Sequence, residues 1–244
     1  MRNVLFRLVL PFLIFAGATN AIAGGVSVLF VGNSLTEVNN LPEVFKQLSA
    51  KSPLRLEVNV QSITPGGAFL YDQWKRGQAV GLLQKTHPKF LVLQGQSTEP
   101  LSARQSFESS VRLFKAEADH DGATTVLFAT WARPSGDPYY KEATSGGSPA
   151  AMQAKLNSAY ASLAKNTGAS LAPVGLAFER AQQDCPDIRL LNGTQHPSPA
   201  GTYLAAAVLF RAIFNASPLG STYYASLPKE TAIRLQRVAD DIRK

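Results

Sequence analysis

The stretch VSVLFVGNSLTEVNNLP, residues 26–42, joins a nearly continuous apolar run to a turn that contains Gly32, Asn33 and Ser34. A run with so few polar residues is typical of a strand that is buried on both faces in the centre of a parallel sheet. Beyond the turn, apolar residues recur at helical spacing at Leu41, Val44, Phe45 and Leu48. The stretch therefore predicts a central strand, a turn and a helix, in that order.

Four further β-rich runs follow, and segments of helical period separate them. The runs are LRLEVNV from residue 54, FLVLQ from 90, TTVLFAT from 124 and SLAPVGL from 170. The run from residue 54 alternates apolar and polar residues, and Pro173 interrupts the last run, so both are expected at sheet edges. This alternation predicts an α/β fold with a mainly parallel five-stranded sheet and helices on both faces.

The helical segments after the third strand have clear apolar stripes. One carries Phe107, Val111, Phe114 and Ala118, and another is expected from about Pro149 to Lys165. Two more are predicted near the end of the chain, with stripes at Tyr203, Ala207, Phe210 and Phe214 and at Leu235, Val238, Ala239 and Ile242. Residues 133–148 are rich in Gly, Pro and Ser and predict a long loop that could contact substrate.

Residues 1–23 have the pattern of a cleavable secretory signal: an Arg-bearing start, an apolar run from Leu8 to Gly17, and Ala21 and Ala23 before the expected cleavage point. The apolar run is short of the roughly 20 residues that span a bilayer. We therefore expect an exported protein, periplasmic or secreted, with no stable membrane insertion after cleavage. Residues 24–244 are expected to form one domain.

Charge and cysteine content exclude some classes of function. The formal net charge of +7 falls to +5 without the leader, and the basic residues are scattered, which argues against a nucleic-acid partner. Cys185 is the single cysteine, so no internal disulfide is expected. No His, Cys or acidic cluster has metal-ligand spacing, and we expect neither a metal nor another cofactor.

Two motifs carry the expected chemistry. Ser34 directly follows the first strand, and ligands of open parallel sheets bind beyond the carboxyl ends of the strands. His196 begins HPSPAG, in which Pro197 and Pro199 restrict a loop that leads into an apolar helix. A general base must be held rigidly against the hydroxyl that it deprotonates, so Ser34 and His196 are the candidate nucleophile and base.

Four sequence blocks in this order resemble the SGNH (GDSL-type) hydrolase superfamily. They are VGNSLTEVNNLP, TPGGAFL, LVLQGQS and HPSPAG, and TWARP and APVGL resemble one bacterial branch. The resemblance implies a three-layer α/β/α sandwich of flavodoxin-like type and ester hydrolysis by Ser34 and His196 through an acyl-enzyme. It also implies an oxyanion hole made by the N–H groups of Ser34 and Gly67 and by a side chain of the third block. Gln96 is the preferred match there, with Ser97 as the alternative.

One position departs from the family pattern. The family usually has Asp three residues before the His, and this chain has Gly193 there. Three hypotheses follow: a Ser-His dyad, in which Asn192 could orient the ring; a carboxylate from elsewhere, such as Asp187; or a chain that has lost activity. Changing such an Asp to Asn in a serine protease costs about 10⁴ in turnover.

The substrate is less well defined by the sequence. Trp131 and Arg133 follow the fourth strand and could line a pocket for a polar or sugar-like group; packing and a surface ion pair are the alternatives. Export favours a short O-acyl group, such as O-acetyl, on a small molecule or polysaccharide. A lipid or lysophospholipid ester, acyl transfer to a sugar, and a non-catalytic carbohydrate-binding module are the other hypotheses.

Overall fold

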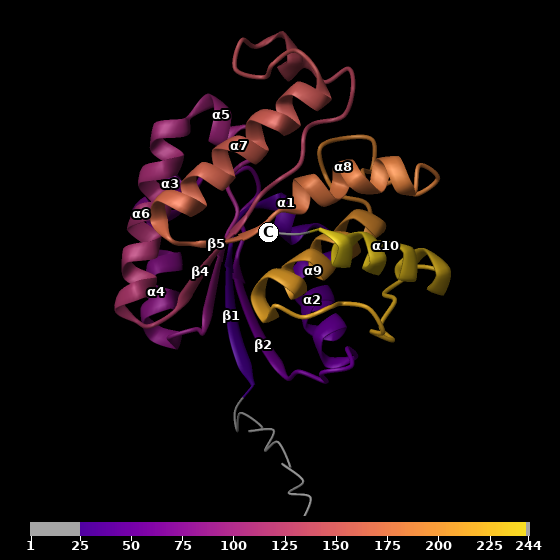
Figure 1. The fold of residues 1–244 in the computed structure, drawn as a ribbon. Coiled ribbons are helices and arrows are strands. Elements are labelled where there is room, and N and C mark those ends of the chain that lie inside the picture. Colours follow the sequence, from indigo (N-terminus) through magenta and orange to yellow (C-terminus); the bar gives the residue numbers. More distant parts are fainter. Residues whose placement is uncertain (1–24, 243–244) are drawn as a thin grey trace, which may run out of the picture.

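The protein folds around one five-stranded parallel sheet with the strand order β2-β1-β3-β4-β5, as seen in the computed structural model (Figure 1). The structure describes residues 25–242, so the expected signal at residues 1–23 lies outside the described part. The strands are β1 (Val26–Val31), β2 (Val58–Ile63), β3 (Phe90–Leu93), β4 (Thr124–Phe128) and β5 (Ser170–Ala172). Every pairing is parallel, and β1 lies inside the sheet between β2 and β3, as expected of a strand that is buried on both faces.

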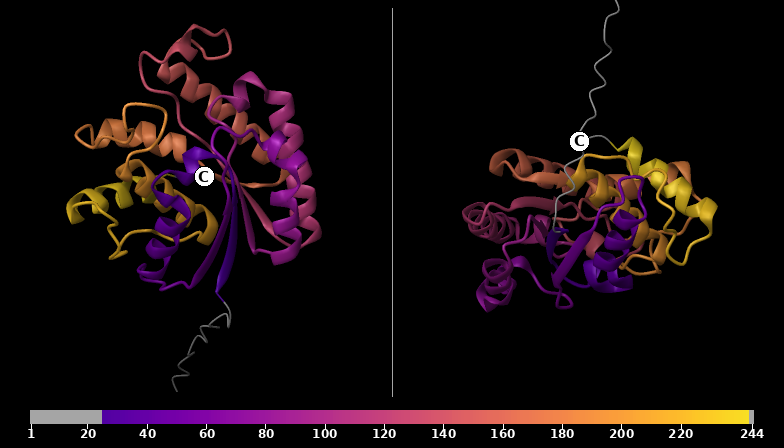
Figure 2. Two further views of the ribbon diagram at one scale, coloured as in Figure 1. Left: turned by 180° about the vertical axis from the view of Figure 1, so that it is seen from behind. Right: turned by 90° about the horizontal axis from the view of Figure 1, so that it is seen from below.

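Helices cover both faces of the sheet, which confirms the predicted three-layer α/β/α sandwich (Figures 1 and 2). One layer contains α2 (Leu41–Ala50), α8 (Val174–Asp184), α9 (Pro199–Phe214) and α10 (Lys229–Asp241). The other contains α3 (Leu70–Arg76), α4 (Gln78–Thr86), α6 (Arg104–His120) and α7 (Pro149–Thr167). Short helices lie in the loops: α1 (Ser34–Glu37), α5 (Glu99–Ser102), and the 3₁₀ turns η1 (Val38–Asn40) and η2 (Pro138–Lys141).

The two cores follow from the alternation of side chains along the buried strands. In β1, Val28 and Phe30 point into the layer of α2 and α9, whereas Leu29 and Val31 point into the opposite layer. Helix α9 is apolar almost all round because it packs against α2, α8, α10 and the sheet. Its buried residues therefore extend around the helix beyond the predicted stripe.

Two strand boundaries differ from the sequence prediction. The second strand begins at Val58 rather than Leu54, because Arg55 adopts a left-handed backbone conformation with φ of 48° that no strand accommodates. The fifth strand ends at Ala172, and the PVGL segment that was predicted as strand instead leads into α8 from Val174. Both strands do lie at sheet edges, as predicted. Helices α3, α4 and α8 were not predicted.

Candidate active site

Ser34 lies where the strand order of the sheet reverses. The chain leaves β1 at Gly32, and its neighbours β2 and β3 lie on opposite sides of β1. In open parallel sheets the loops beyond such a position diverge and leave a crevice for ligands. The fold therefore puts the turn at Ser34 in the expected ligand-binding region.

Buried amides hold the Ser34 turn in place. The side-chain oxygen of Gln94, at the end of β3, accepts bonds of 2.9 Å from both Asn33 N–H and the Thr36 hydroxyl. Gln94 has a relative exposure of only 1%. A Cβ added at Gly32 would lie 2.6 Å from the Gln94 side-chain oxygen, so this close approach requires glycine.

Asn33 joins the turn to the loop after β2. Its side-chain oxygen accepts the Leu35 N–H at 3.1 Å, which fixes the amide so that its nitrogen donates to Ala68 O at 3.0 Å. An aspartate at this position could accept the first bond but could not donate the second. Asn33 thereby holds the Gly67 loop beside Ser34.

The structure brings Ser34 and His196 together, although 162 positions separate them in sequence. The distance between Ser34 Oγ and His196 Nε2 is 3.0 Å, which is within hydrogen-bonding range. This arrangement allows the imidazole to take the hydroxyl proton if the ring proton lies on Nδ1.

Thr194, which the sequence analysis did not select, is the partner of the second ring nitrogen. Its Oγ1 lies 3.1 Å from His196 Nδ1, accepts the His196 backbone N–H at 3.1 Å and donates to Asn192 Oδ1 at 2.7 Å. Asn192 therefore acts on the ring only through Thr194. Gly193, in the usual Asp position, has φ of 93°, which strains any residue with a Cβ. The Asn-Gly pair before Thr194 is a turn signal that could have suggested this geometry.

Asp187, the substitute carboxylate considered from the sequence, does not bind His196. Its two oxygens accept bonds of 2.6 Å each from the guanidinium of Arg234. This pairing holds the pKa of Asp187 below its ordinary value. On the Nδ1 side of His196 the structure therefore has a hydroxyl and an amide, both exposed to solvent, and no carboxylate among the described residues.

Two flanking contacts fix the loop that carries His196. Trp131 Nε1 donates to Gln195 O at 3.0 Å, and the Asn39 amide donates to Pro197 O at 3.0 Å. Trp131 is 2% exposed and stacks on Phe178 with ring centroids 4.2 Å apart. Its indole thus packs against Phe178 and positions the loop, and Trp131 also lines a cavity beside this loop, so its contact with substrate stays a prediction.

Three N–H groups in the segments after β1, β2 and β3 donate no hydrogen bond to any residue in the described range 25–242. They are the backbone N–H groups of Ser34 and Gly67 and the side-chain amide of Gln96. The Gln96 side-chain oxygen accepts from Thr98 N–H at 2.7 Å and from its hydroxyl at 2.9 Å, which leaves the nitrogen as the open end. Ser97, the alternative match, instead accepts from Arg133 at 3.1 Å.

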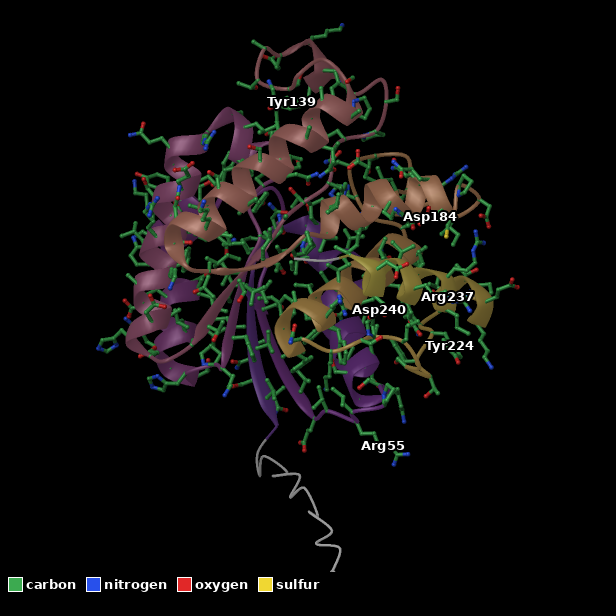
Figure 3. All side chains as sticks on the ribbon, viewed as in Figure 1. Arg55, Tyr139, Asp184, Tyr224, Arg237 and Asp240 are labelled. Atoms are coloured by element: carbon green, nitrogen blue, oxygen red, sulfur yellow. The ribbon has the colours of Figure 1, made fainter. Side chains whose placement is uncertain are left out.

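A cavity of about 680 Å³ lies beside the His196 loop. It is lined by the segment after β4, the start of α7, α8 and the approach to His196 through Leu191 and Gly193. Arg133 lines it while bonded to Asp137 and Ser97, with its guanidinium over the Tyr139 ring. Figure 3 shows Tyr139 at the end of the molecule towards which the strands run, with Arg55 at the opposite end.

Within residues 25–242, no three His, Cys, Asp or Glu side chains gather closely enough to hold a metal ion. No helix in that range combines the length and apolar character needed to cross a bilayer.

Comparisons with known proteins identify relatives through structure. No protein-family model matches the chain, and no curated protein sequence does. A candidate SGNH hydrolase from Slackia heliotrinireducens is 30% identical, with a TM-score of 0.64; the match covers 78% of this chain and all of that one. A DUF4886 family protein from Bacteroides uniformis is 15% identical with a TM-score of 0.74, covering 89% and 94%. An acetylxylan esterase from Geobacillus stearothermophilus is 15% identical with a TM-score of 0.60, covering 79% and 95%.

Proposed function

Because this chain belongs to the SGNH (GDSL-type) hydrolase superfamily, we propose that it is a serine ester hydrolase with Ser34 as nucleophile and His196 as general base. The observation that carries the proposal is the 3.0 Å separation of Ser34 Oγ and His196 Nε2 at the carboxyl end of β1. A nucleophile and its base must lie within such a distance for proton transfer to accompany attack.

The reaction proceeds in two halves. His196 Nε2 takes the proton of Ser34 as Oγ attacks the ester carbonyl, and the imidazolium then protonates the departing alcohol oxygen. Water, deprotonated by His196, releases the acid from the acyl-enzyme and restores the serine hydroxyl. In each half the tetrahedral oxyanion accepts bonds from Ser34 N–H, Gly67 N–H and the Gln96 amide, the three donors that have no partner in the described chain.

Thr194 supplies orientation without charge. As an acceptor from Nδ1–H it keeps Nε2 unprotonated, the tautomer that a base requires. It cannot stabilise the imidazolium as a carboxylate does, so the enzyme is expected to turn over more slowly than a complete triad.

The cavity beside the His196 loop favours a substrate with a polar alcohol portion, such as an O-acetylated carbohydrate. Its wall includes hydrogen-bonding side chains that suit sugar hydroxyls: Arg133, Gln153, Glu179, Gln182, Gln183 and Arg189. A volume of about 680 Å³ is in the range of small-molecule binding sites. The neighbour from Geobacillus stearothermophilus is described as an acetylxylan esterase, which agrees with this substrate class.

We also propose that the protein acts outside the cytoplasm after cleavage at residue 23. The support is the signal pattern of residues 1–23. N-terminal sequencing of protein recovered from an envelope or culture fraction should begin at Gly24, and an intact Met1 in that fraction would contradict cleavage.

The central test is hydrolysis of p-nitrophenyl acetate by the wild-type protein and Ser34→Ala. The variant should lose at least about 10³-fold in kcat, because the covalent route is removed. Retention of the full rate would show that Ser34 is not the nucleophile. The substrate class is tested with p-nitrophenyl octanoate: a lipid-like pocket would gain rate as methylenes are added, whereas we expect acetyl to be preferred.

A further inference from the structure

Glu99 is a buried carboxylate that the proposed mechanism has not used. It opens α5, three residues after Gln96, and its relative exposure is 0%. A buried carboxyl group is costly unless it accepts hydrogen bonds, so its partners indicate what it is for.

The partners of Glu99 come from two different loops of the candidate oxyanion hole. One carboxylate oxygen accepts Leu70 N–H at 3.1 Å, and the other accepts Gln96 N–H at 2.8 Å. Leu70 follows the loop of Gly67, and Gln96 is itself a candidate donor. The Glu99 side chain thus connects the segment after β2 to the segment after β3.

The surroundings of Glu99 favour this bridge. A Cβ added at Gly95 would lie 3.3 Å from the nearer carboxylate oxygen and 2.6 Å from the Phe107 ring, so glycine permits the close contact. Two titratable side chains face the carboxyl group, Asp72 from α3 and Tyr160 from α7. Burial raises the pKa of Tyr160, which keeps it neutral, and no Lys or Arg within residues 25–242 forms an ion pair with Glu99.

We propose that Glu99 is a positioning residue whose ionised carboxylate aligns the Gly67 loop and Gln96 as oxyanion donors. The proposal rests on the ester hydrolase function proposed above. An ionised carboxylate accepts both N–H groups strongly, whereas a protonated one offers weaker acceptors and an O–H that competes with them. The alignment of the hole therefore follows the protonation state of a residue that does not touch substrate.

This role has a signature in the pH profile. Burial, and secondarily Asp72, raises the pKa of Glu99 to about 7, against three backbone N–H bonds that lower it. Alignment of the oxyanion donors then requires Glu99 to be deprotonated. In the wild type, kcat/KM should therefore fall as the pH drops below about 7, and it should fall more steeply than in Glu99→Gln.

Glu99→Gln is the direct test, because it keeps the shape but cannot ionise. Its amide replaces one carboxylate oxygen by an NH2 group, which cannot accept a backbone N–H, so kcat should fall about 10- to 100-fold with little change in KM. The acid limb of the pH profile should be less steep than in the wild type. Asp72→Asn is the matched control, since it removes a nearby carboxylate that makes no bond to either loop. Equal loss of kcat in both variants, or a wild-type kcat and slope in Glu99→Gln, would overturn the proposal.

A second measurement needs no activity and no mutation. In the wild-type protein the amide protons of Leu70 and Gln96 should change NMR chemical shift together with an apparent pKa of about 7, as their acceptor ionises. If neither amide titrates near that pH, the proposal is wrong even if Glu99→Gln fails to fold. If both titrate while Ser34→Ala keeps full activity, the bridge stands and the proposed catalytic route fails.

Discussion

At the scale of single residues, the most consequential substitution in this site is a hydroxyl in the place of a carboxylate. The Thr194 hydroxyl contacts Nδ1 of His196 and donates its own hydrogen bond to the side-chain oxygen of Asn192. A neutral acceptor can fix the orientation and tautomer of the ring, as a triad acid does, but it supplies no charge to stabilise the imidazolium.

Thr194→Val should therefore lower kcat about tenfold, the effect of losing one neutral hydrogen bond of about 1.4 kcal/mol. Valine keeps the shape of threonine but leaves Nδ1–H without an acceptor in the loop. Thr194→Ser is the matched control and should remain near the wild-type rate. Steady-state hydrolysis of p-nitrophenyl acetate measures both. An undiminished kcat in Thr194→Val would mean that water orients His196 just as well.

Sequence reasoning reached some of these residues and not others. Ser34 and His196 could be selected because each stands in a motif tied to the end of a strand or the start of a helix. Thr194 was missed, because the Asn192-Gly193 pair indicates a turn but not that the turn at Gly193 brings the Thr194 hydroxyl to the ring of His196. Asp187 had a suitable charge, but its partner Arg234 lies 47 positions away in sequence.

At the scale of secondary-structure elements, the start of α9 controls the loop that carries the base. A Cβ added at Gly201 would lie 2.2 Å from Leu190 O, which also accepts the Ser198 N–H at 2.8 Å. The first turn of α9 is therefore in direct contact with the backbone that leads to His196.

Gly201→Ala should destabilise the protein by about 1–3 kcal/mol through overpacking and should lower kcat by displacing His196. Gly81→Ala in α4 is the contrasting variant, since nothing lies within 4 Å of the added methyl group. That change should raise stability by about 0.5–1 kcal/mol and leave kcat unchanged. Urea unfolding and ester hydrolysis measure the two effects. Equal effects of the two alanines would refute the packing argument.

The pattern of apolar residues in the sequence was sufficient to predict some secondary-structure elements but not others. Strands β1, β3 and β4 are continuous apolar runs, and their positions were predicted well because burial on both faces leaves little ambiguity. The PVGL segment was predicted as strand because it is short and apolar, a composition shared by buried strands and buried helix starts. Packing of α8 against α7, α9 and α10 decides in favour of the helix.

At the scale of the whole molecule, ionisation of Glu99 is expected to favour activity but to lower the free energy of unfolding. Its pKa rises from 4.5 to about 7 on folding, so the folded state binds the proton more tightly than the unfolded state does. The contribution of Glu99 to stability is complete below about pH 4.5 and is lost as the pH rises through about 7. This loss amounts to about 3 kcal/mol, since one pKa unit corresponds to 1.36 kcal/mol.

The free energy of unfolding should show this difference in urea titrations at pH 5 and pH 8.5. The wild type should lose about 3 kcal/mol more between the two values than Glu99→Gln, in which the group cannot titrate. Comparing the two proteins cancels the contributions of all other ionisable residues. Parallel pH dependence in both would mean that Glu99 has the same pKa in the folded and unfolded states.

The 162-residue separation of Ser34 and His196 has a consequence for the order of events in synthesis. The ribosome makes the nucleophile 162 positions before the base, so the growing chain carries Ser34 without its partner throughout that interval. Helix α9, which follows His196, completes the core against α2, a neighbour of the Ser34 turn. Ester hydrolysis therefore requires this long-range contact to form, and the appearance of activity during refolding reports the docking of the His196 segment beside Ser34.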